Sequence, residues 1–118
     1  IAGHSDISFN ESSLHVTPSG DIVCFIRSFG MDDHTVVARS TDGKSFNWFD
    51  AGWRGHPHHA LGLPGGRVLL VYGYRHDPVG IRARLLDPEC SDVKEAEEIV
   101  LRDDGGGWDI GYPWSMPL

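Results

Sequence analysis

Three histidines fall within four positions of the sequence, at His56, His58 and His59. Residues i and i+2 of a strand point to the same face, so two of these imidazoles can act together. A histidine exchanges protons near neutral pH because its unperturbed pKa is about 6.5. Acid–base work by His56 or His58 is therefore one interpretation, and packing or hydrogen bonding is a second. A metal site is the third, although zinc needs a further protein ligand that the sequence does not identify.

Acidic and aromatic side chains follow a glycine-rich run at residues 105–107. Loops carried on a rigid scaffold often hold binding groups, and an indole face can stack on a sugar ring. We therefore expect Asp109, Tyr112 and Trp114 to be substrate-binding residues. A plain connector, with the tryptophan packed in a core, is the alternative interpretation.

The composition restricts the class of partner. A net charge of −7 and 40% hydrophobic residues describe an acidic, folded chain, and such a chain does not suit a nucleic-acid partner. Apolar runs are about five residues long, too short for a membrane helix of roughly 20. Cys24 and Cys90 match no metal or redox spacing; we expect buried thiols and leave a pairing between them open. The chain begins at Ile1 without a leader pattern, so we expect a processed or truncated start.

An internal repeat organises the chain. Pro18-Ser19-Gly20 recurs 46 residues later as Pro64-Gly65-Gly66, each between two apolar stretches, and residues 37–42 resemble residues 82–87. Proline followed by glycine is typical of a tight turn between strands. A period near 45 residues with several short strands per unit is typical of a β-propeller blade. The sequence therefore predicts an all-β propeller fragment of two four-stranded antiparallel blades and the start of a third.

The repeat also predicts the boundaries. We expect a lead-in over 1–10, a first blade over 11–54, a second over 55–104 and the start of a third over 105–118. Within the blades the predicted strands are 12–17, 21–28, 34–40, 46–50, 58–63, 67–75, 80–86 and 97–102. Helix-forming composition is confined to 93–98, which is too short to form a helix against strand-like neighbours. Natural propellers have about four to eight blades, so a longer parent, expected to be six-bladed, or several copies must close the ring.

Residues 40–46, Ser-Thr-Asp-Gly-Lys-Ser-Phe, resemble the Asp-box of the sialidase-type (BNR-repeat) superfamily, with one residue missing between the aspartate and the glycine. In such a box the carboxylate accepts backbone N–H bonds in a hairpin turn and the aromatic packs beneath the blade. The resemblance implies a structural part for Ser40, Asp42, Gly43 and Phe46. Residues 85–89 keep only the aspartate, so the second box is expected to be degenerate.

The resemblance extends to Asn10-Glu11 and to Arg27, which ends the next apolar strand. In sialidase-type enzymes the matching glutamate polarises a tyrosine nucleophile and the arginine binds the substrate carboxylate. The resemblance thus implies a catalytic Glu11 and anion contacts at Arg27 and Arg75, with a surface glutamate and a blade-edge arginine as the alternative. Trp114 stands where similar bacterial proteins are expected to have arginine, which leaves the identity of the sugar open.

The function implied is that of a sialidase-like glycoside hydrolase, or a fragment of one, acting on acidic sugars or uronic-acid-containing glycans. The alternative is a noncatalytic carbohydrate- or protein-binding propeller that completes its ring as a homo-oligomer. A carbohydrate ligand is the expected partner, and no cofactor, metal, nucleic acid or membrane is expected. Relatives of this kind are often secreted or periplasmic, and the compartment of this chain stays open.

Overall fold

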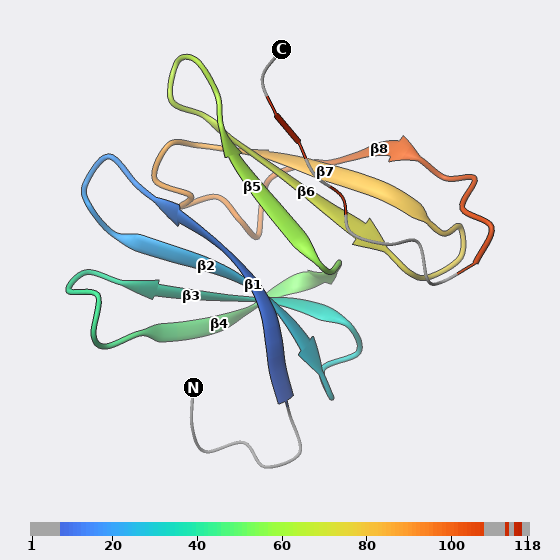
Figure 1. Ribbon diagram of the computed structural model, residues 1–118, viewed down its shortest axis with the longest axis horizontal. Helices are drawn as coiled ribbons and strands as arrows, with labels where there is room; N and C mark the ends of the chain where they lie inside the picture. Colours follow the sequence, from blue (N-terminus) through green and yellow to red (C-terminus); the bar gives the residue numbers. More distant parts are fainter. Residues whose placement is uncertain (1–7, 108–112, 114, 117–118) are drawn as a thin grey trace.

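The computed structural model describes residues 8–107, 113, 115 and 116, and its eight strands form two separate sheets (Figure 1). The first sheet contains β1 (Ser8–Val16), β2 (Ile22–Phe29), β3 (His34–Ser40) and β4 (Asn47–Arg54). The second contains β5 (His58–Gly62), β6 (Val68–Tyr74), β7 (Gly80–Leu86) and β8 (Glu98–Arg102). Each sheet follows chain order with antiparallel neighbours, and the described residues include no helix. The all-β, four-strand prediction is therefore confirmed.

The repeat seen in the sequence is also a repeat of strand register. Leu14 pairs with Cys24 between β1 and β2, and Ala60 pairs with Leu70 between β5 and β6. The two Pro-x-Gly turns close alike, because Gly20 donates to Thr17 O at 2.9 Å and Gly66 to Leu63 O at 3.0 Å. Gly20 and Gly66 have positive φ, which a residue with a side chain rarely adopts.

The spacing of the third strands corrects one detail of the predicted alignment. Cys24 pairs with Ala38 and Leu70 pairs with Arg84, so β3 and β7 are equivalent at the same 46-residue offset as the turns. The alignment of 37–42 on 82–87 was therefore one residue out of register. A shift of one residue exchanges the two faces of a strand, so Arg84 corresponds to Ala38 and not to Arg39.

The strands begin and end close to their predicted positions, with two exceptions. β1 starts at Ser8 instead of residue 12, and β4 runs to Arg54 instead of residue 50. In both places the ladder has a register shift, between Phe9 and Ser12 and between His34 and Val36, and such an irregularity interrupts the alternation by which a strand is recognised in the sequence.

The main core lies between the two sheets. Phe25, Val37 and Trp53 of the first sheet meet Leu70 and Tyr72 of the second. The Trp53 and Tyr72 rings stack with centroids 4.8 Å apart. Cys90 lies in this core, whereas Cys24 lies on the opposite face of β2 with Ile26, Val36 and Ala38. The two cysteines are free thiols, and their places on different faces explain why they are not joined.

The two sheets contact each other through faces that are not equivalent in the repeat. Phe25 and Val37 face the second sheet, yet their equivalents Val71 and Ala83 lie on the face of the second sheet that is turned away from the first. β1 and β5 contact each other, and Ala60 N donates to Ser13 Oγ at 3.1 Å. The packing is therefore head-to-tail, front of one sheet on back of the next.

Among the described residues no segment forms a helix that could cross a bilayer.

Candidate functional site

Polar side chains from five parts of the chain meet at one end of the two sheets. This end is formed by the β2–β3, β4–β5 and β6–β7 connections together with the first half of β1. The set, called here the polar cluster, consists of Glu11, Arg27, Asp33, His56, Arg75 and His76.

An ion pair between adjacent strands opens the cluster. Arg27 Nη1 of β2 lies 2.9 Å from Glu11 Oε2 of β1, with the two side chains 12% and 36% exposed. The guanidinium also lies over the Phe29 ring, 5.1 Å from its centroid. Arg27 Nε is buried and has no hydrogen-bond partner among the described residues. One buried donor of the arginine thus lacks a partner among the described residues, which is uncommon for a buried polar atom.

His56 is the buried member of the cluster. Its backbone N–H donates to Gly73 O at 2.9 Å, which ties the β4–β5 connection to the end of β6. Burial, followed by the positive charge of Arg27, lowers the pKa of His56, so its ring is neutral at physiological pH. Neither ring nitrogen makes a hydrogen bond to the described residues. A buried polar ring in this state is unusual and is typical of a site that receives a polar ligand.

Asp33 lies between the two histidines of the cluster, His56 and His76. His76 Nε2 lies 2.8 Å from Asp33 Oδ2, and His56 Nε2 lies 3.4 Å from Asp33 Oδ1. Burial tends to raise the pKa of Asp33, but the hydrogen bond from His76 and the interaction with the nearby His56 ring outweigh it and lower that pKa. The carboxylate is therefore ionised. Asp33 has a φ of 59°, a left-handed conformation that aspartate tolerates better than most residues.

A glycine explains how the cluster closes over the core. A Cβ on Gly55 would lie 2.3 Å from Cδ2 of Tyr72, so no larger residue fits here. The N–H of Gly55 donates to Asp33 O at 3.1 Å. The bare backbone at Gly55 therefore lets the Asp33 turn and His56 approach each other above Tyr72.

His58 lies apart from the cluster, against the main core. Its Nε2 lies 2.7 Å from Thr35 Oγ1, and that hydroxyl donates to Gly55 O, so the imidazole Nε2–H is the donor to Thr35. Burial lowers the pKa of His58 to about 3, with His56 as the second cause. A ring that stays neutral and packs near Phe25 and Tyr72 does not serve as an acid or base near neutral pH. We therefore leave His58 out of the proposed site.

The three neighbouring histidines enter three different environments. His59 lies on the other face of β5, where its Nδ1 is 2.9 Å from Ser115 Oγ. Within the described ranges no group of three histidine, cysteine, aspartate or glutamate side chains is arranged to hold a metal ion.

The structure brings together Glu11, Arg27, His56 and Arg75 of the predicted site. Asp109, Tyr112 and Trp114 lie outside the described residues. Asp33 and His76 were missed by the sequence analysis, since neither belongs to a motif. The weak signal available was an acidic pair, Asp32-Asp33, in the turn before β3.

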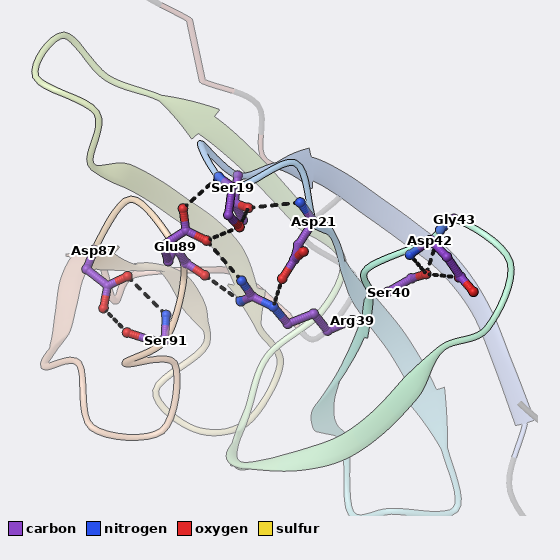
Figure 2. A network of polar contacts seen from close by, with 10 residues as sticks. Ser19, Asp21, Arg39, Ser40, Asp42, Gly43, Asp87, Glu89 and Ser91 are labelled. Atoms are coloured by element: carbon purple, nitrogen blue, oxygen red, sulfur yellow. Dashed lines mark hydrogen bonds and ion pairs between the residues drawn. The ribbon is translucent and has the colours of Figure 1, made fainter.

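The predicted Asp-box, residues 40–46, lies at the opposite end of the first sheet, in the β3–β4 turn (Figure 2). Asp42 Oδ1 accepts the N–H groups of Lys44 at 2.8 Å and Ser45 at 2.9 Å, and the Ser40 hydroxyl donates to it at 3.0 Å. Gly43 N–H donates to Ser40 Oγ at 2.8 Å. The bonds from Ser45 and Lys44 lower the pKa of Asp42. These contacts close the hairpin and place the box far from the polar cluster.

Phe46 departs from the expected packing. It is 40% exposed and lies in the turn before β4, not beneath the sheet. The box lacks one residue, so the strand begins only at Asn47 and the aromatics that pack against the two cores are Trp48 and Phe49. In the second sheet Asp87 still accepts the N–H and hydroxyl of Ser91.

A bridge between the sheets lies at the same end as the Asp-box (Figure 2). Glu89, from the β7–β8 connection, accepts the N–H of Ser19 at 2.9 Å and the hydroxyl of Ser19 at 2.6 Å. Arg39 Nη2 lies 3.1 Å from Glu89 Oε1, and Arg39 Nε lies 2.8 Å from Asp21 Oδ2. The bridge fixes the first hairpin turn to the second sheet.

Comparisons with known proteins give one structural relative. The chain resembles a solved protein of unknown function from Dyadobacter fermentans DSM 18053, at 56% sequence identity and a TM-score of 0.92. The match covers 97% of this chain and 32% of that one, so this chain spans about a third of its relative. No protein-family model matches the sequence. No curated protein matches it either.

Proposed function

We propose that the chain is part of a sialidase-like glycoside hydrolase, and that the polar cluster binds the carboxylate of an acidic sugar or of a uronic-acid-containing glycan. The observation that carries the proposal is the buried Nε–H of Arg27, which has no hydrogen-bond partner among the described residues, in one cluster with the buried ring of His56. Two arginines, Arg27 and Arg75, both lower the pKa of this ring, so both guanidinium groups lie near it. Arginine suits a carboxylate because its planar fork donates two parallel hydrogen bonds.

Glu11 fits this proposal as the residue that orients the fork. Its carboxylate takes one terminal nitrogen of Arg27 and leaves Nε for the ligand. The implied action of Glu11 on a tyrosine nucleophile stays a prediction. His56 is a neutral hydrogen-bonding group in this site, because its lowered pKa keeps it uncharged.

We further propose that the two sheets are successive blades of a propeller, because each leaves one docking face open. Leu14 is 62% exposed, yet its equivalent Ala60 packs against the core between the sheets. In the second sheet Ile99 is exposed, yet its equivalent Phe49 packs there. Apolar residues at positions that the existing interface buries are expected where a further blade docks on each side.

The length of the solved relative supports a ring formed by one longer chain. Two sheets correspond to 32% of that chain, so its whole length would hold about six blades in total, within the usual range. The second candidate, a noncatalytic binding propeller whose copies complete the ring, is favoured by the same open faces at Leu14 and Val16. In that case the polar cluster binds the sugar without turnover.

The binding proposal is tested by calorimetric titration with N-acetylneuraminate, glucuronate and neutral glucose. The two acids are expected to bind and glucose is not. Arg27→Lys keeps the charge but removes the fork, so the affinity for the acids should fall about tenfold, equivalent to about 1.4 kcal/mol.

Arg67→Lys is the matched control, because Arg67 lies in the turn at the other end of the second sheet and donates to Leu85 O. Equal affinity in both variants, or equal binding of glucose, would contradict the proposal. Turnover of acidic glycosides by the protein, lost in Glu11→Gln with binding retained, separates the hydrolase from the binding module.

A further inference from the structure

We propose that His76 and Asp33 form the proton-transfer pair of the polar cluster, with His76 as the acid–base group and Asp33 as its positioning residue. This inference rests on the proposed hydrolase and names a catalytic residue in it that no sequence motif indicates. The distance of 2.8 Å between His76 Nε2 and Asp33 Oδ2 is that of a charge-assisted hydrogen bond.

The pair has a defined tautomer. An ionised carboxylate can only accept, so the neutral His76 ring must place its proton on Nε2 and its lone pair on Nδ1. Nδ1 makes no hydrogen bond to the described residues, and the side chain is 31% exposed. His76 can therefore meet water or a ligand while Asp33 fixes its orientation, the arrangement expected of a general base.

The other histidines of this region cannot take this part. His58 packs against the core with its proton committed to Thr35, and the His56 side chain is only 4% exposed, so a water molecule does not reach its ring as it reaches His76. His34 makes a similar bond to Asp50 at 2.9 Å, but it lines a different pocket, together with Arg54 and Glu98. Among these histidines, His76 combines a short bond to a carboxylate in the cluster with a partly exposed ring.

Asp33 connects the pair to the anion spot. Its second oxygen lies 3.4 Å from His56 Nε2, and His56 in turn lies within reach of the charges of Arg27 and Arg75. The backbone of Asp33 is held in the left-handed region, and its carbonyl accepts the N–H of Gly55. A strained residue held by its neighbours is a feature that accumulates at functional sites.

In the proposed step His76 Nδ1 takes a proton from a water molecule as the water oxygen bonds to the anomeric carbon. The glycosidic C–O bond breaks on the opposite side of the same carbon, and the departing oxygen takes a proton from a second water molecule. The hydroxide formed in this way takes back the proton of the imidazolium, which Asp33 stabilises until then. One water is consumed, and no proton is gained or lost overall. The carboxylate of the sugar, held at Arg27, fixes the distance between the anomeric carbon and His76.

The first test compares His76→Gln and Asp33→Asn with Asp50→Asn, the matched control that breaks the similar pair outside the cluster. Turnover of an acidic glycoside should fall about 10²- to 10⁴-fold in His76→Gln, with the affinity for glucuronate unchanged. Asp33→Asn should show a smaller loss, and Asp50→Asn none. Full turnover in His76→Gln would overturn the inference.

A second test needs no turnover. Diethyl pyrocarbonate reacts with the lone pair of a neutral imidazole, and mass spectrometry gives the rate for each histidine. Asp33→Asn should slow the modification of His76 several-fold, glucuronate should protect it, and Asp50→Asn should leave it unchanged. A rate unaffected by Asp33→Asn overturns the pair. If no acidic sugar binds but the rate responds, the proposed substrate fails and the pair stands.

Discussion

Burial decides which histidines of this chain can carry charge. His58 and His56 are two positions apart, and both have a lowered pKa because burial penalises the imidazolium form. The unfolded chain takes up these protons near the unperturbed pKa of about 6.5, whereas the folded chain resists them. Protonation therefore favours the unfolded state, and the free energy of unfolding must fall as the pH decreases below that value.

His58 offers a direct measurement of this linkage. Between its unfolded pKa of about 6.5 and its folded value of about 3, it should reduce stability by up to about 1.4 kcal/mol per pH unit of acidification. His58→Gln keeps a donor for Thr35 but cannot titrate, so urea unfolding from pH 7 to pH 4 should show a shallower slope. Parallel slopes for the two proteins would show that His58 titrates normally in the folded state.

At the residue scale, the sequence predicted which residues belong to the candidate site better than it predicted what surrounds each of them. Glu11 and Arg27 are 16 positions apart, and the hairpin between them brings them to 2.9 Å. Asp33 and His76 lie on different sheets, so their contact depends on how the sheets pack. The alternation of side chains along β5 correctly puts His58 on the opposite face from its neighbours in the strand. Only the packed structure shows that this face is turned toward the main core. Long-range packing is the information that one sequence lacks.

At the scale of the element, the β3–β4 turn is a structural staple. Ser40 is buried, and its hydroxyl both accepts the Gly43 N–H and donates to Asp42. Ser40→Ala should lower the free energy of unfolding by about 1 kcal/mol, because it leaves the Gly43 N–H without its partner. Thr41→Ala is the control, since Thr41 is exposed in the same turn and should change stability by less than about 0.5 kcal/mol.

Chemical denaturation measures both effects. A cost for Thr41→Ala as large as that for Ser40→Ala would mean that the turn is generally sensitive and that the Asp-box contacts have no special part. Ligand affinity should not change in either variant, because the turn lies at the end of the sheet opposite the polar cluster.

Strands were predictable because their apolar residues repeat. The two hairpins share the Pro-x-Gly turn, and the 46-residue offset reproduces the strand pairs Leu14–Cys24 and Ala60–Leu70. The alignment failed by one residue at β3, where Arg39 appeared to match Arg84. The error arose because two arginines were matched for being the same residue type. Their environments differ, since Arg39 binds Glu89 in the bridge and Arg84 lies over the Trp53 ring.

At the scale of the whole molecule, the two sheets are joined both by a core and by polar contacts. Tyr72 lies at the centre, where its ring stacks on Trp53 and its hydroxyl donates to Glu98 Oε2 at 2.6 Å. Arg84 Nε donates to the same hydroxyl at 3.0 Å. Because burial and Glu98 raise the pKa of Tyr72, the hydroxyl stays protonated and keeps this bond throughout the physiological range.

The head-to-tail packing of these sheets leads to a prediction about association. The chain on its own exposes Leu14 and Val16 on one side and Ile99 on the other, and a front-to-back contact between copies would cover both. Light scattering coupled to size exclusion should therefore show oligomers of the isolated chain. Leu14→Lys combined with Val16→Lys should shift them toward a monomer of 13.0 kDa.

Phe46→Lys is the matched control, because Phe46 is also exposed and apolar but belongs to the Asp-box turn and not to a docking face. It should leave the association unchanged. A well-folded monomer at every concentration would show that the open faces do not attract one another, and would remove the support for a ring of copies. An equal loss of association in Phe46→Lys would mean that exposed apolar residues associate nonspecifically, whether or not they belong to a docking face. Association lost only in the Leu14 and Val16 variant places the contact between copies on the outer face of the first sheet.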